Sequence, residues 1–434
     1  MKICIIGTGY VGLVSGTCFA ELGNNVICVD NDKEKIEKLK NNVIPIYEPG
    51  LKELIQRNCR QNRLFFTTNI NSSIRKSDII FICVGTPTNK TNNKANLKYV
   101  YKVTNSIKKN INKYKIVVTK STVPVTTGDR IEKILNSKKN KKNIKIDVVS
   151  NPEFLREGEA IRDFLYPDRV VIGTSSNKAN NILKNLYLPI IKKTNRYFHT
   201  SRRSAELIKY ASNGFLATKI AYINEIANLS EKLKIDISEI AVGMGLDERI
   251  GDRFLRAGPG YGGSCFPKDT RALVSIAKNF KSNLSIINSV IKSNSNRYKY
   301  LINRILSIMN NKIKNKNIAF LGVTFKAGTD DMRESPSLKI IPYLSKKGAK
   351  IRYYDPSGIK AEFKKFKNVN FFSTISLACK NSDLIIIHTE WNEFKQLNMK
   401  KINKKKNFKL YDMRNLYSPV KMKKNKINYF GIGR

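Results

Sequence analysis

Short, nearly continuous apolar runs alternate with amphipathic stretches over the first 150 residues of the chain. The apolar runs cover residues 2–6, 25–30, 78–84, 116–119 and 146–149. Strands of a parallel sheet are covered by helices on both faces, so they show continuous apolar runs of this kind. The pattern therefore predicts an open parallel α/β sheet in this part of the chain.

One long helix is predicted over residues 201–233, because apolar side chains recur there at spacings of mostly three, four or seven. This spacing predicts a single buried stripe, made of Leu207, Ala211, Phe215, Tyr222, Ile226, Leu229 and Leu233. Helical pattern continues to about residue 309 and is interrupted by a glycine-rich stretch at residues 258–263.

The α/β alternation restarts after a basic connector at residues 312–316. A strand at 317–323, a helix at 335–347 and a strand at 350–355 are predicted, and the string SDLIII at 382–387 echoes SDIIFI at 77–82. The predicted fold class is α/β, with two Rossmann-like parallel-sheet domains joined by a central helical region with one long helix. The predicted domain boundaries are 1–200, 201–311 and 312–434.

Composition narrows the classes of function. Of 434 residues, 41% are hydrophobic and 26% charged, which excludes a disordered tail, a collagen-like fibre and a disulfide miniprotein. The net charge of +46 raises the question of a nucleic-acid partner. The lysines are scattered among many asparagines and isoleucines, all with A/T-rich codons, so we interpret the charge as biased nucleotide composition. We expect no specific nucleic-acid partner.

The cysteine, apolar and histidine patterns bear on location and metals. Seven cysteines without zinc-type CxxC pairs indicate a reduced, cytoplasmic setting. Residues 3–20 carry no charge, but four glycines interrupt them, and no segment reaches about 20 apolar residues, so no membrane segment is expected. Neither His199 nor His388 has a partner at metal-ligand spacing, so no metal is expected.

A dinucleotide fingerprint, GTGYVG, covers residues 7–12 between a predicted strand and a predicted helix. Gly7 permits the tight turn, Gly9 lets the backbone approach a pyrophosphate, and Gly12 allows close packing. The N-terminus of the helix supplies free N–H groups. Asp30 ends the next strand and would bind a ribose 2′-hydroxyl while repelling a 2′-phosphate, so NAD is favoured over NADP.

Two later strand ends carry the strings VGTPT and KSTVP. Ligands of an open parallel sheet collect beyond the carboxyl ends of its strands, which places Thr86 and Thr122 near the cofactor. Taken alone, each threonine could equally cap a helix.

The stretch GPGYGGSCFPKD at residues 258–269 is the densest chemical signal. Four glycines within six residues indicate a close approach of backbone and ligand. Cys265 follows them directly, so Lys268 could lower the pKa of its thiol and Asp269 could take or hold a proton. The alternative is a buried structural thiol, which is our interpretation of the other six cysteines.

Three further motifs carry charged side chains, and the first two allow two interpretations each. Lys209 and Asn213 share one helical face, where they could stabilise an oxyanion or form a solvated surface. The string NPEFLREG at 151–158 offers two carboxylates and an arginine, or a capped helix start. Lys326 and Arg333 follow the first strand of the second sheet, where they suit the phosphates of a second nucleotide-like ligand.

Together these motifs resemble one family, the nucleotide-sugar 6-dehydrogenases, and within it the UDP-glucose branch. The likeness covers GTGYVG, VGTPT, KSTVP, NPEFLREGEA, YPDRVVIG, the Lys209/Asn213 helix, DERIGDRFLRAGPGYGGSCFPKD and GVTFKAGTDDMRES, in the order of the family. It implies that the first domain binds NAD, that the central domain forms a homodimer through its long helix, and that the last domain binds the UDP-sugar.

The resemblance implies a four-electron oxidation of UDP-glucose to UDP-glucuronate in two NAD-dependent steps, without release of the aldehyde. Cys265 would form a thiohemiacetal and then a thioester, which water hydrolyses. Lys209 and Asn213 would steady the oxyanions, and Asp269 with an ordered water would handle protons. Glu153, assisted by Thr122, is implied in proton transfer and the positioning of water.

The same resemblance implies the ligand contacts. The residues implied to hold NAD are Gly7, Gly9, Tyr10, Val11, Gly12, Asp30, Lys35, Thr86, Thr122, Glu157, Lys268 and Arg333. The residues implied to bind the sugar nucleotide are Phe154, Leu155, Arg156, Glu157, Lys209, Asn213, Phe254, Leu255, Arg256, Ala257, Gly258, Gly262 and Lys326. Arg249 is implied to reach the substrate of a neighbouring subunit, and Arg414 is a further carried-over position.

Four other interpretations remain open. The same chemistry could act on GDP-mannose or a UDP-N-acetylhexosamine, since sugar choice depends on a few contacts of ~1–3 kcal/mol each. A two-electron β-hydroxyacid dehydrogenase would leave Cys265 and the second sheet without a purpose. A basic nucleic-acid-binding protein would need clustered basic and aromatic residues, and an inactive sensor would not need Cys265, Lys209 and Asp269.

Overall fold

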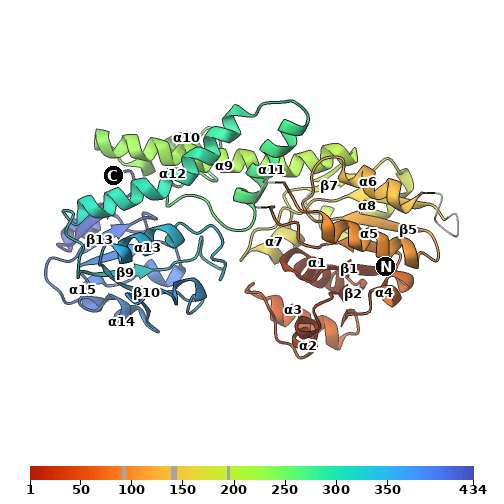
Figure 1. Cartoon of the computed structure of the whole chain (residues 1–434), viewed down its shortest axis with the longest axis horizontal. Coiled ribbons are helices and arrows are strands. Elements are labelled where there is room, and N and C mark those ends of the chain that lie inside the picture. The colour runs from red at the N-terminus through yellow and green to blue at the C-terminus, as the bar shows by residue number, and fades with distance from the viewer. Residues whose placement is uncertain (90–93, 138–143, 193–195) are drawn as a thin grey trace. The chain divides into compact units, whose positions relative to one another are not determined.

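The computed structural model describes residues 1–89, 94–137, 144–192 and 196–434. The chain forms two compact units, the first made of Met1–Ser212 with Ser275–Ser282, and the second of Asn213–Val274 with Asn283–Arg434. Each unit contains one β-sheet with helices packed against it (Figure 1).

The sheet of the first unit has eight strands in the order β3-β2-β1-β4-β5-β6-β7-β8. The strands are β1 (Lys2–Ile6), β2 (Asn25–Val29), β3 (Leu64–Thr67), β4 (Ile79–Ile82), β5 (Lys115–Thr119), β6 (Ile146–Ser150), β7 (Val170–Gly173) and β8 (Tyr197–Thr200). Neighbouring strands are parallel except β6 and β7, which meet antiparallel.

Helices cover both faces of this sheet, as the continuous apolar runs require. Ile3 and Ile5 of β1 belong to one buried cluster, whereas Cys4 and Ile6 belong to the cluster on the opposite face. The helices are α1 (Tyr10–Glu21), α2 (Lys33–Lys40), α3 (Leu51–Arg60), α4 (Ile70–Lys76), α5 (Lys98–Asn110), α6 (Thr127–Leu135), α7 (Ala160–Leu165) and α8 (Asn177–Ile191).

The five strands predicted in this region are present, and three more extend the sheet. The edge strands β3 and β8 are only four residues long and partly exposed, so they lack the continuous apolar run of a buried strand. Strand β7 is fully buried but equally short. A short apolar run cannot be told from a buried helix segment by periodicity alone.

The sheet of the second unit has six strands in the order β11-β10-β9-β12-β13-β14, all parallel. They are β9 (Asn317–Leu321), β10 (Lys350–Tyr354), β11 (Val369–Phe371), β12 (Leu384–Ile387), β13 (Lys409–Asp412) and β14 (Asn428–Gly431). Counted from its own first strand, this is the order 3-2-1-4-5-6 of a doubly wound dinucleotide-binding sheet. Ser337–Lys346 (α13), Ile375–Cys379 (α14), Met399–Ile402 (α15) and Pro419–Lys424 (α16) are its helices, with 3₁₀ turns at Ala361–Phe363 and Asn392–Phe394.

Four helices form the helical region between the two sheets in the sequence. They are α9 (Arg202–Leu233), α10 (Ile237–Gly245), α11 (Phe266–Asn279) and α12 (Ser285–Ile308). The prediction of two parallel-sheet domains with a helical region and one long helix is therefore confirmed. The predicted connector at 312–316 is exposed on either side of one buried side chain, Ile313.

The predicted burial of the α9 stripe is wrong within this chain. Leu207, Ala211, Phe215, Tyr222, Leu229 and Leu233 are exposed, and Ile226 is partly buried. The opposite face is buried instead, and it carries small and polar side chains such as Ala217, Lys209 and Asn213. Helical periodicity identifies two faces, but it does not determine which of them the rest of the chain covers.

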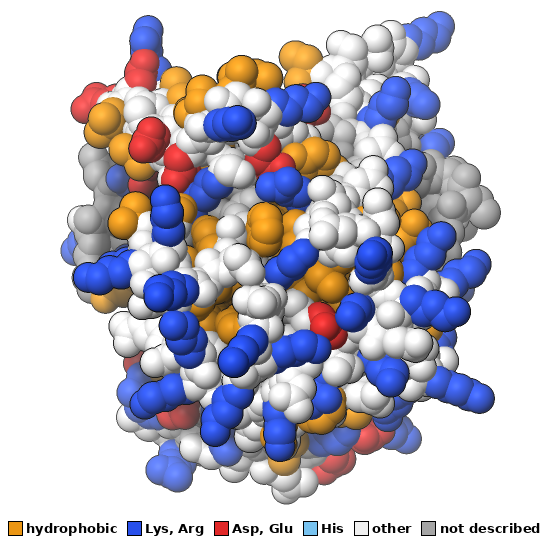
Figure 2. All heavy atoms as spheres, turned by 90° about the vertical axis from the view of Figure 1, so that its left-hand side faces the viewer, with side chains coloured by type: hydrophobic (Ala, Val, Ile, Leu, Met, Phe, Trp, Pro, Cys, Tyr) orange, Lys and Arg blue, Asp and Glu red, His pale blue; other side chains and the backbone are white. Residues whose placement is uncertain are grey.

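The basic side chains are spread over the surface. In Figure 2, blue Lys and Arg side chains are distributed across the whole visible face. Red Asp and Glu side chains are fewer there, in keeping with 80 basic against 34 acidic residues in the chain. Among the described residues, no helix combines the length and apolarity needed to span a membrane.

Candidate active site

The glycine fingerprint forms the turn between β1 and α1, with Gly9 as the N-cap of the helix. A Cβ on Gly12 would lie 1.8 Å from the carbonyl oxygen of Gly7, so the helix approaches the strand end only because residue 12 is glycine. A Cβ on Gly9 would meet no heavy atom within 4 Å. The turn is open at the helix N-terminus, where N–H groups bind an anion, so these residues fit the pyrophosphate of NAD.

Asp30 is held in place directly beside this turn. Its Oδ2 accepts hydrogen bonds of 2.8 Å from both the backbone N–H and the hydroxyl of Thr8, and Lys35 Nζ lies 3.2 Å away. Burial alone would raise the pKa of Asp30, but the Thr8 hydrogen bonds and the Lys35 charge bring the pKa below its usual value. The side chain is thus an ionised acceptor at the edge of the cofactor turn.

A buried ion pair joins the loop after β6 to α9. Lys209 Nζ lies 3.0 Å from Glu153 Oε1, and the two side chains are 4% and 5% exposed. The other carboxylate oxygen accepts the Leu155 N–H at 2.7 Å. Burial would raise the pKa of Glu153, but Lys209, Leu155 and the buried Lys120 together lower it. Glu153 is therefore a carboxylate at neutral pH, and the expectation of a solvated Lys209 face does not hold.

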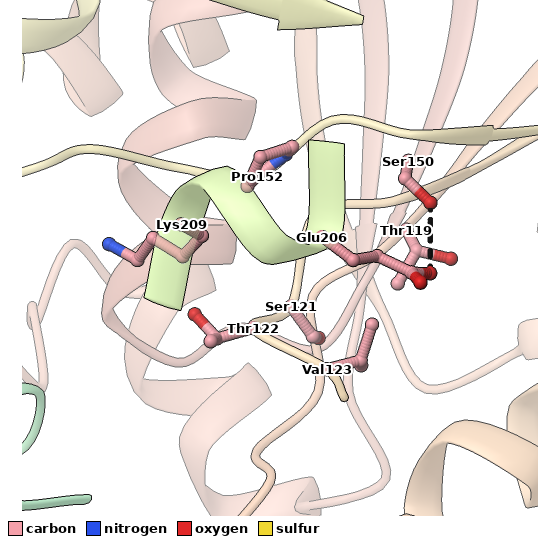
Figure 3. A pocket seen from close by; sticks show the side chains of 8 residues that line it. All are labelled: Thr119, Ser121, Thr122, Val123, Ser150, Pro152, Glu206 and Lys209. Atoms are coloured by element: carbon pink, nitrogen blue, oxygen red, sulfur yellow. Dashed lines mark hydrogen bonds between the residues drawn. The ribbon is translucent and has the colours of Figure 1, made fainter. Parts of the chain in front are cut away.

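A small pocket lies beside this ion pair (Figure 3). Lys209 and Thr122 line it, together with Thr119, Ser121, Val123, Ser150, Pro152 and Glu206. The carbonyl of Thr122 accepts a hydrogen bond of 2.8 Å from the Thr86 hydroxyl, so the two threonine loops touch each other. In Figure 3, the side chains of Thr122 and Lys209 point toward the same side of the pocket, away from Glu206.

Glu206 on α9 accepts hydrogen bonds from the loop that follows Thr122. Its carboxylate accepts hydrogen bonds from the N–H groups of Thr126 (2.8 Å) and Gly128 (2.7 Å) and from the Ser150 hydroxyl (3.1 Å). Burial raises the pKa of Glu206 to about 7, against these hydrogen bonds. The sequence motifs did not mark this residue, and the only available signal was an acid one helical turn before Lys209.

In the second unit, Cys265 directly precedes α11 and its carbonyl accepts the Asp269 N–H at 2.8 Å. The thiol is half-buried at the helix N-terminus, 3.4 Å from the Ser264 hydroxyl, where the helix dipole favours an anion. One turn further, the fully buried Asp269 accepts hydrogen bonds from Asn213 (2.6 Å) and Lys268 (2.5 Å). A thiol, a carboxylate, an amide and a cation are thus assembled around the first turn of α11.

The glycine-rich stretch packs on the loop after β9. The N–H of Gly263 donates to the Arg333 carbonyl at 2.8 Å. A Cβ on Gly262 would lie 2.6 Å from the carbonyl oxygen of Glu334 and 3.0 Å from Phe325. Arg414 donates to the Phe325 carbonyl at 2.9 Å from the other side. The structure therefore brings the predicted positions Gly262, Lys326, Arg333 and Arg414 to one loop cluster of the second unit.

The remaining predicted positions differ in exposure. Phe154 lies under a cationic pair, with Arg169 3.7 Å and Lys209 5.3 Å from its ring centroid. Arg156 is bound by Asp163, and Arg249 is 89% exposed and bound by Asp247. The others are distributed as follows: Leu155, Glu157, Lys268 and Phe254 are partly buried, Arg256 is exposed, and Leu255, Ala257 and Gly258 are buried.

The second sheet repeats the aspartate-to-backbone contact of the first sheet. Asp355 accepts the Val323 N–H at 2.8 Å, as Asp30 accepts that of Thr8. Asp355 is, however, 1% exposed, and a Cβ on Gly322 would lie 2.4 Å from Thr389. The acid that follows the second strand is therefore buried in the second sheet and only partly buried in the first.

The other cysteines differ from Cys265 in setting. Cys4, Cys18, Cys28, Cys83 and Cys379 are buried and Cys59 is partly buried, and desolvation raises the pKa of each thiol. Within the part of the chain that the structure describes, no three His, Cys, Asp or Glu side chains are grouped for a metal ion.

These features define an NAD-dependent oxidoreductase, with an open dinucleotide turn in one unit and a thiol and carboxylate centre in the other. The chain matches the UDP-glucose/GDP-mannose dehydrogenase family in its NAD binding domain (residues 1–191), central domain (203–296) and UDP binding domain (319–419). The protein belongs to this family.

Individual relatives match over essentially the whole chain. It is 46% identical to UDP-glucose 6-dehydrogenase TuaD of Bacillus subtilis, over 100% of this chain and 93% of that protein. It is 44% identical to UDP-glucose 6-dehydrogenase of Rickettsia felis, over 100% of this chain and 96% of that protein. A solved UDP-glucose dehydrogenase from Pyrobaculum islandicum has a TM-score of 0.90 at 31% identity and covers 99% of this chain and 97% of its own.

Proposed function

We propose that this enzyme oxidises the C6 alcohol of UDP-glucose to the carboxylate of UDP-glucuronate through a thioester on Cys265. The observation that carries this proposal is the placement of Cys265 at the head of α11, beside an Asp269 held by Asn213 and Lys268. A dehydrogenase that stops at the carbonyl has no use for such a thiol, whereas a four-electron oxidation needs a covalent intermediate that retains the aldehyde.

The overall reaction balances with one water. One sugar alcohol, two NAD⁺ and one water give one carboxylate, two NADH and three protons. NAD, when bound at the open turn of α1, supplies the hydride acceptor for each of the two oxidations. Gly7 to Gly12, Asp30 and Lys35 would hold it, with Thr86, Thr122, Glu157, Lys268 and Arg333 as further contacts carried over from the family likeness.

Cys265 and Asp269 perform the covalent chemistry in this proposal. The thiolate forms a C–S bond with the C6 aldehyde carbon, and loss of hydride converts the thiohemiacetal into a thioester. Water then breaks the C–S bond, which releases the carboxylate and restores the thiol. Asp269, which accepts hydrogen bonds from Asn213 and Lys268, exchanges the protons through an ordered water.

Four side chains contact the oxygen atoms of the developing oxyanions and of the water: Lys209, Asn213, Glu153 and Thr122. Lys209 and Asn213 donate hydrogen bonds to the developing oxyanions, and their burial supports this role because donors are most effective where water is excluded. Glu153 is ionised beside Lys209, so it accepts protons and orients water with Thr122.

The sugar nucleotide is proposed to contact two loops of the sequence and the cluster after β9. The contacts are Phe154, Leu155, Arg156, Glu157, Lys209, Asn213, Phe254, Leu255, Arg256, Ala257, Gly258, Gly262 and Lys326, with Arg249 serving a partner's substrate. Because Leu255 lies in the core, only its backbone is available for such a contact. Relatives named for UDP-glucose support this sugar, and GDP-mannose and UDP-N-acetylhexosamines are the alternatives.

We also infer a homodimer formed through the exposed stripe of α9. Phe215 is 65% exposed, and Tyr222, Leu229 and Leu233 are at least half exposed on the same face. A large apolar face on a helix costs free energy in water, and a second copy of the same helix would cover it. The matched family regions support domain boundaries near residues 200 and 311, and seven free thiols support a reducing, cytoplasmic location.

The experiment is the stoichiometry of NADH formed per UDP-glucose consumed, measured for the wild type and for Cys265→Ser. Two NADH per sugar, with turnover lost in the variant, supports the four-electron route. One NADH per sugar contradicts the role of Cys265. No NADH with UDP-glucose, followed by NADH with GDP-mannose or a UDP-N-acetylhexosamine, retains the chemistry and replaces the substrate.

A further inference from the structure

Glu48 links the cofactor turn to the loop that carries Glu153 and Glu157. It lies between β2 and β3 in the chain and is 8% exposed. One carboxylate oxygen accepts the Gly158 N–H at 2.7 Å, and the other accepts the Ala160 N–H at 2.8 Å. These two N–H groups end the 151–158 segment and begin α7, so a distant carboxylate determines the position of that segment.

Tyr10 closes the connection on the cofactor side. It is the first residue of α1, directly after Gly9, and its hydroxyl donates to Glu48. The same hydroxyl accepts the Gly158 N–H at 2.9 Å. Burial first, and then the hydrogen bond to Glu48, raise the pKa of Tyr10, so the hydroxyl keeps its proton and remains the donor.

The three groups form a closed ring of hydrogen bonds. The Gly158 N–H is shared by Tyr10 and Glu48, and Tyr10 also binds Glu48. Displacement of the α1 start would break two of these contacts together, because each group in the ring holds the other two. The start of α1 and the end of the 151–158 segment are therefore linked by hydrogen bonds within the first unit, although they lie almost 150 residues apart in the sequence.

We propose that Glu48 is a positioning residue that couples dinucleotide binding at α1 to the binding of the sugar nucleotide by the 151–158 segment. This inference rests on the proposed function. A dinucleotide that orders the first turn of α1 also orders Tyr10. Through the closed ring of hydrogen bonds, Tyr10 then restricts the motion of Gly158 and its neighbour Glu157. Binding of one ligand then reduces the ordering cost for the other, and the effect is reciprocal.

The experiment measures the dissociation constant of UDP-glucose by calorimetry, with and without saturating NADH. NADH cannot be reduced further, so it does not oxidise the sugar during the titration. One variant is Tyr10→Phe, which removes the hydroxyl and keeps the aromatic side chain. The other is Glu48→Gln, which keeps the shape of the side chain and replaces one hydrogen-bond acceptor by a donor. The matched control is Tyr114→Phe in the same unit, because Tyr114 also donates to a carboxylate, Asp147, at 2.6 Å. Thermal midpoints are recorded for all four proteins.

We expect NADH to tighten UDP-glucose binding about fivefold or more in the wild type and in Tyr114→Phe. In Tyr10→Phe and Glu48→Gln, the factor falls below about twofold even where the thermal midpoint matches that of the control. A wild type without coupling, or variants that retain the wild-type factor, overturns the inference. If UDP-glucose fails to bind the wild type at all, the proposed substrate is wrong, and the same titration with the sugar nucleotide that does bind decides the inference.

Discussion

Replacement of Lys209 by methionine separates the structural part of the Glu153–Lys209 pair from its proposed chemical part. The pair is 3.0 Å long and its side chains are 4% and 5% exposed, so Lys209→Met leaves a buried carboxylate without its nearest cation. Loss of one partner of a buried ion pair costs ~3–5 kcal/mol, because the remaining charge has lost its water and its counter-charge. At ~2–4 °C per kcal/mol for a unit of this size, the thermal midpoint falls by about 10 °C.

The loss depends on pH in a defined direction. Lys209 and Lys120 lower the pKa of Glu153 in the wild type, so the pair contributes stability above the unfolded pKa, and this contribution is lost as pH falls through the folded pKa. In Lys209→Met the pKa of Glu153 rises, and the variant is therefore closest to the wild type in acid. Chemical denaturation at pH 5 and pH 8 measures both differences.

A second substitution tests the reasoning directly. In Lys209→Met/Glu153→Gln the buried charge is gone, so we expect most of the stability to return while NADH formation remains lost. The control is Lys232→Met on the exposed side of the same helix, which changes stability by less than about 0.5 kcal/mol. A Lys209→Met variant as stable as this control, or a double variant with additive losses, would refute the ion-pair argument.

Three further outcomes follow from single positions. Gly12→Ala places a Cβ 1.8 Å from the Gly7 carbonyl, so NADH binding measured by fluorescence titration weakens about tenfold or more. Burial raises the pKa of Glu206 to about 7 from 4.5, so relative to Glu206→Gln the wild type loses roughly 3 kcal/mol of unfolding free energy between pH 4 and pH 8, measured in urea. Phe215→Glu places a charge on the exposed stripe of α9, so we expect sedimentation to detect monomers of this variant in place of the dimer proposed for the wild type.

Each of these outcomes has a matched control. Gly243→Ala meets no atom within 4 Å and leaves NADH binding unchanged. Glu225→Gln replaces an exposed acid on α9 and keeps the wild-type pH dependence, and Val420→Glu charges a 77% exposed apolar residue of α16 without effect on assembly. Normal NADH binding by Gly12→Ala, a Glu206→Gln variant that tracks the wild type with pH, or a dimeric Phe215→Glu protein contradicts the corresponding argument.

The sequence by itself determined the features that depend on local pattern. Continuous apolar runs identified the central strands of both sheets, because a strand buried on both faces has no polar positions to interrupt it. The turn glycines, Asp30 and the Cys265 stretch were recognisable because they carry characteristic residue types at characteristic spacings in the sequence. The long α9 was equally clear, since its periodicity extends over nine turns of helix.

Only the tertiary structure decided which surfaces are covered and which distant groups meet. The face of α9 that the chain buries carries mostly small and apolar side chains, and Lys209 and Asn213 on it have buried partners in Glu153 and Asp269. Glu48 and Glu206 gain their roles from backbone N–H groups far away in the sequence. Every residue except proline carries such an N–H group, so no particular residue type in the sequence marks these contacts.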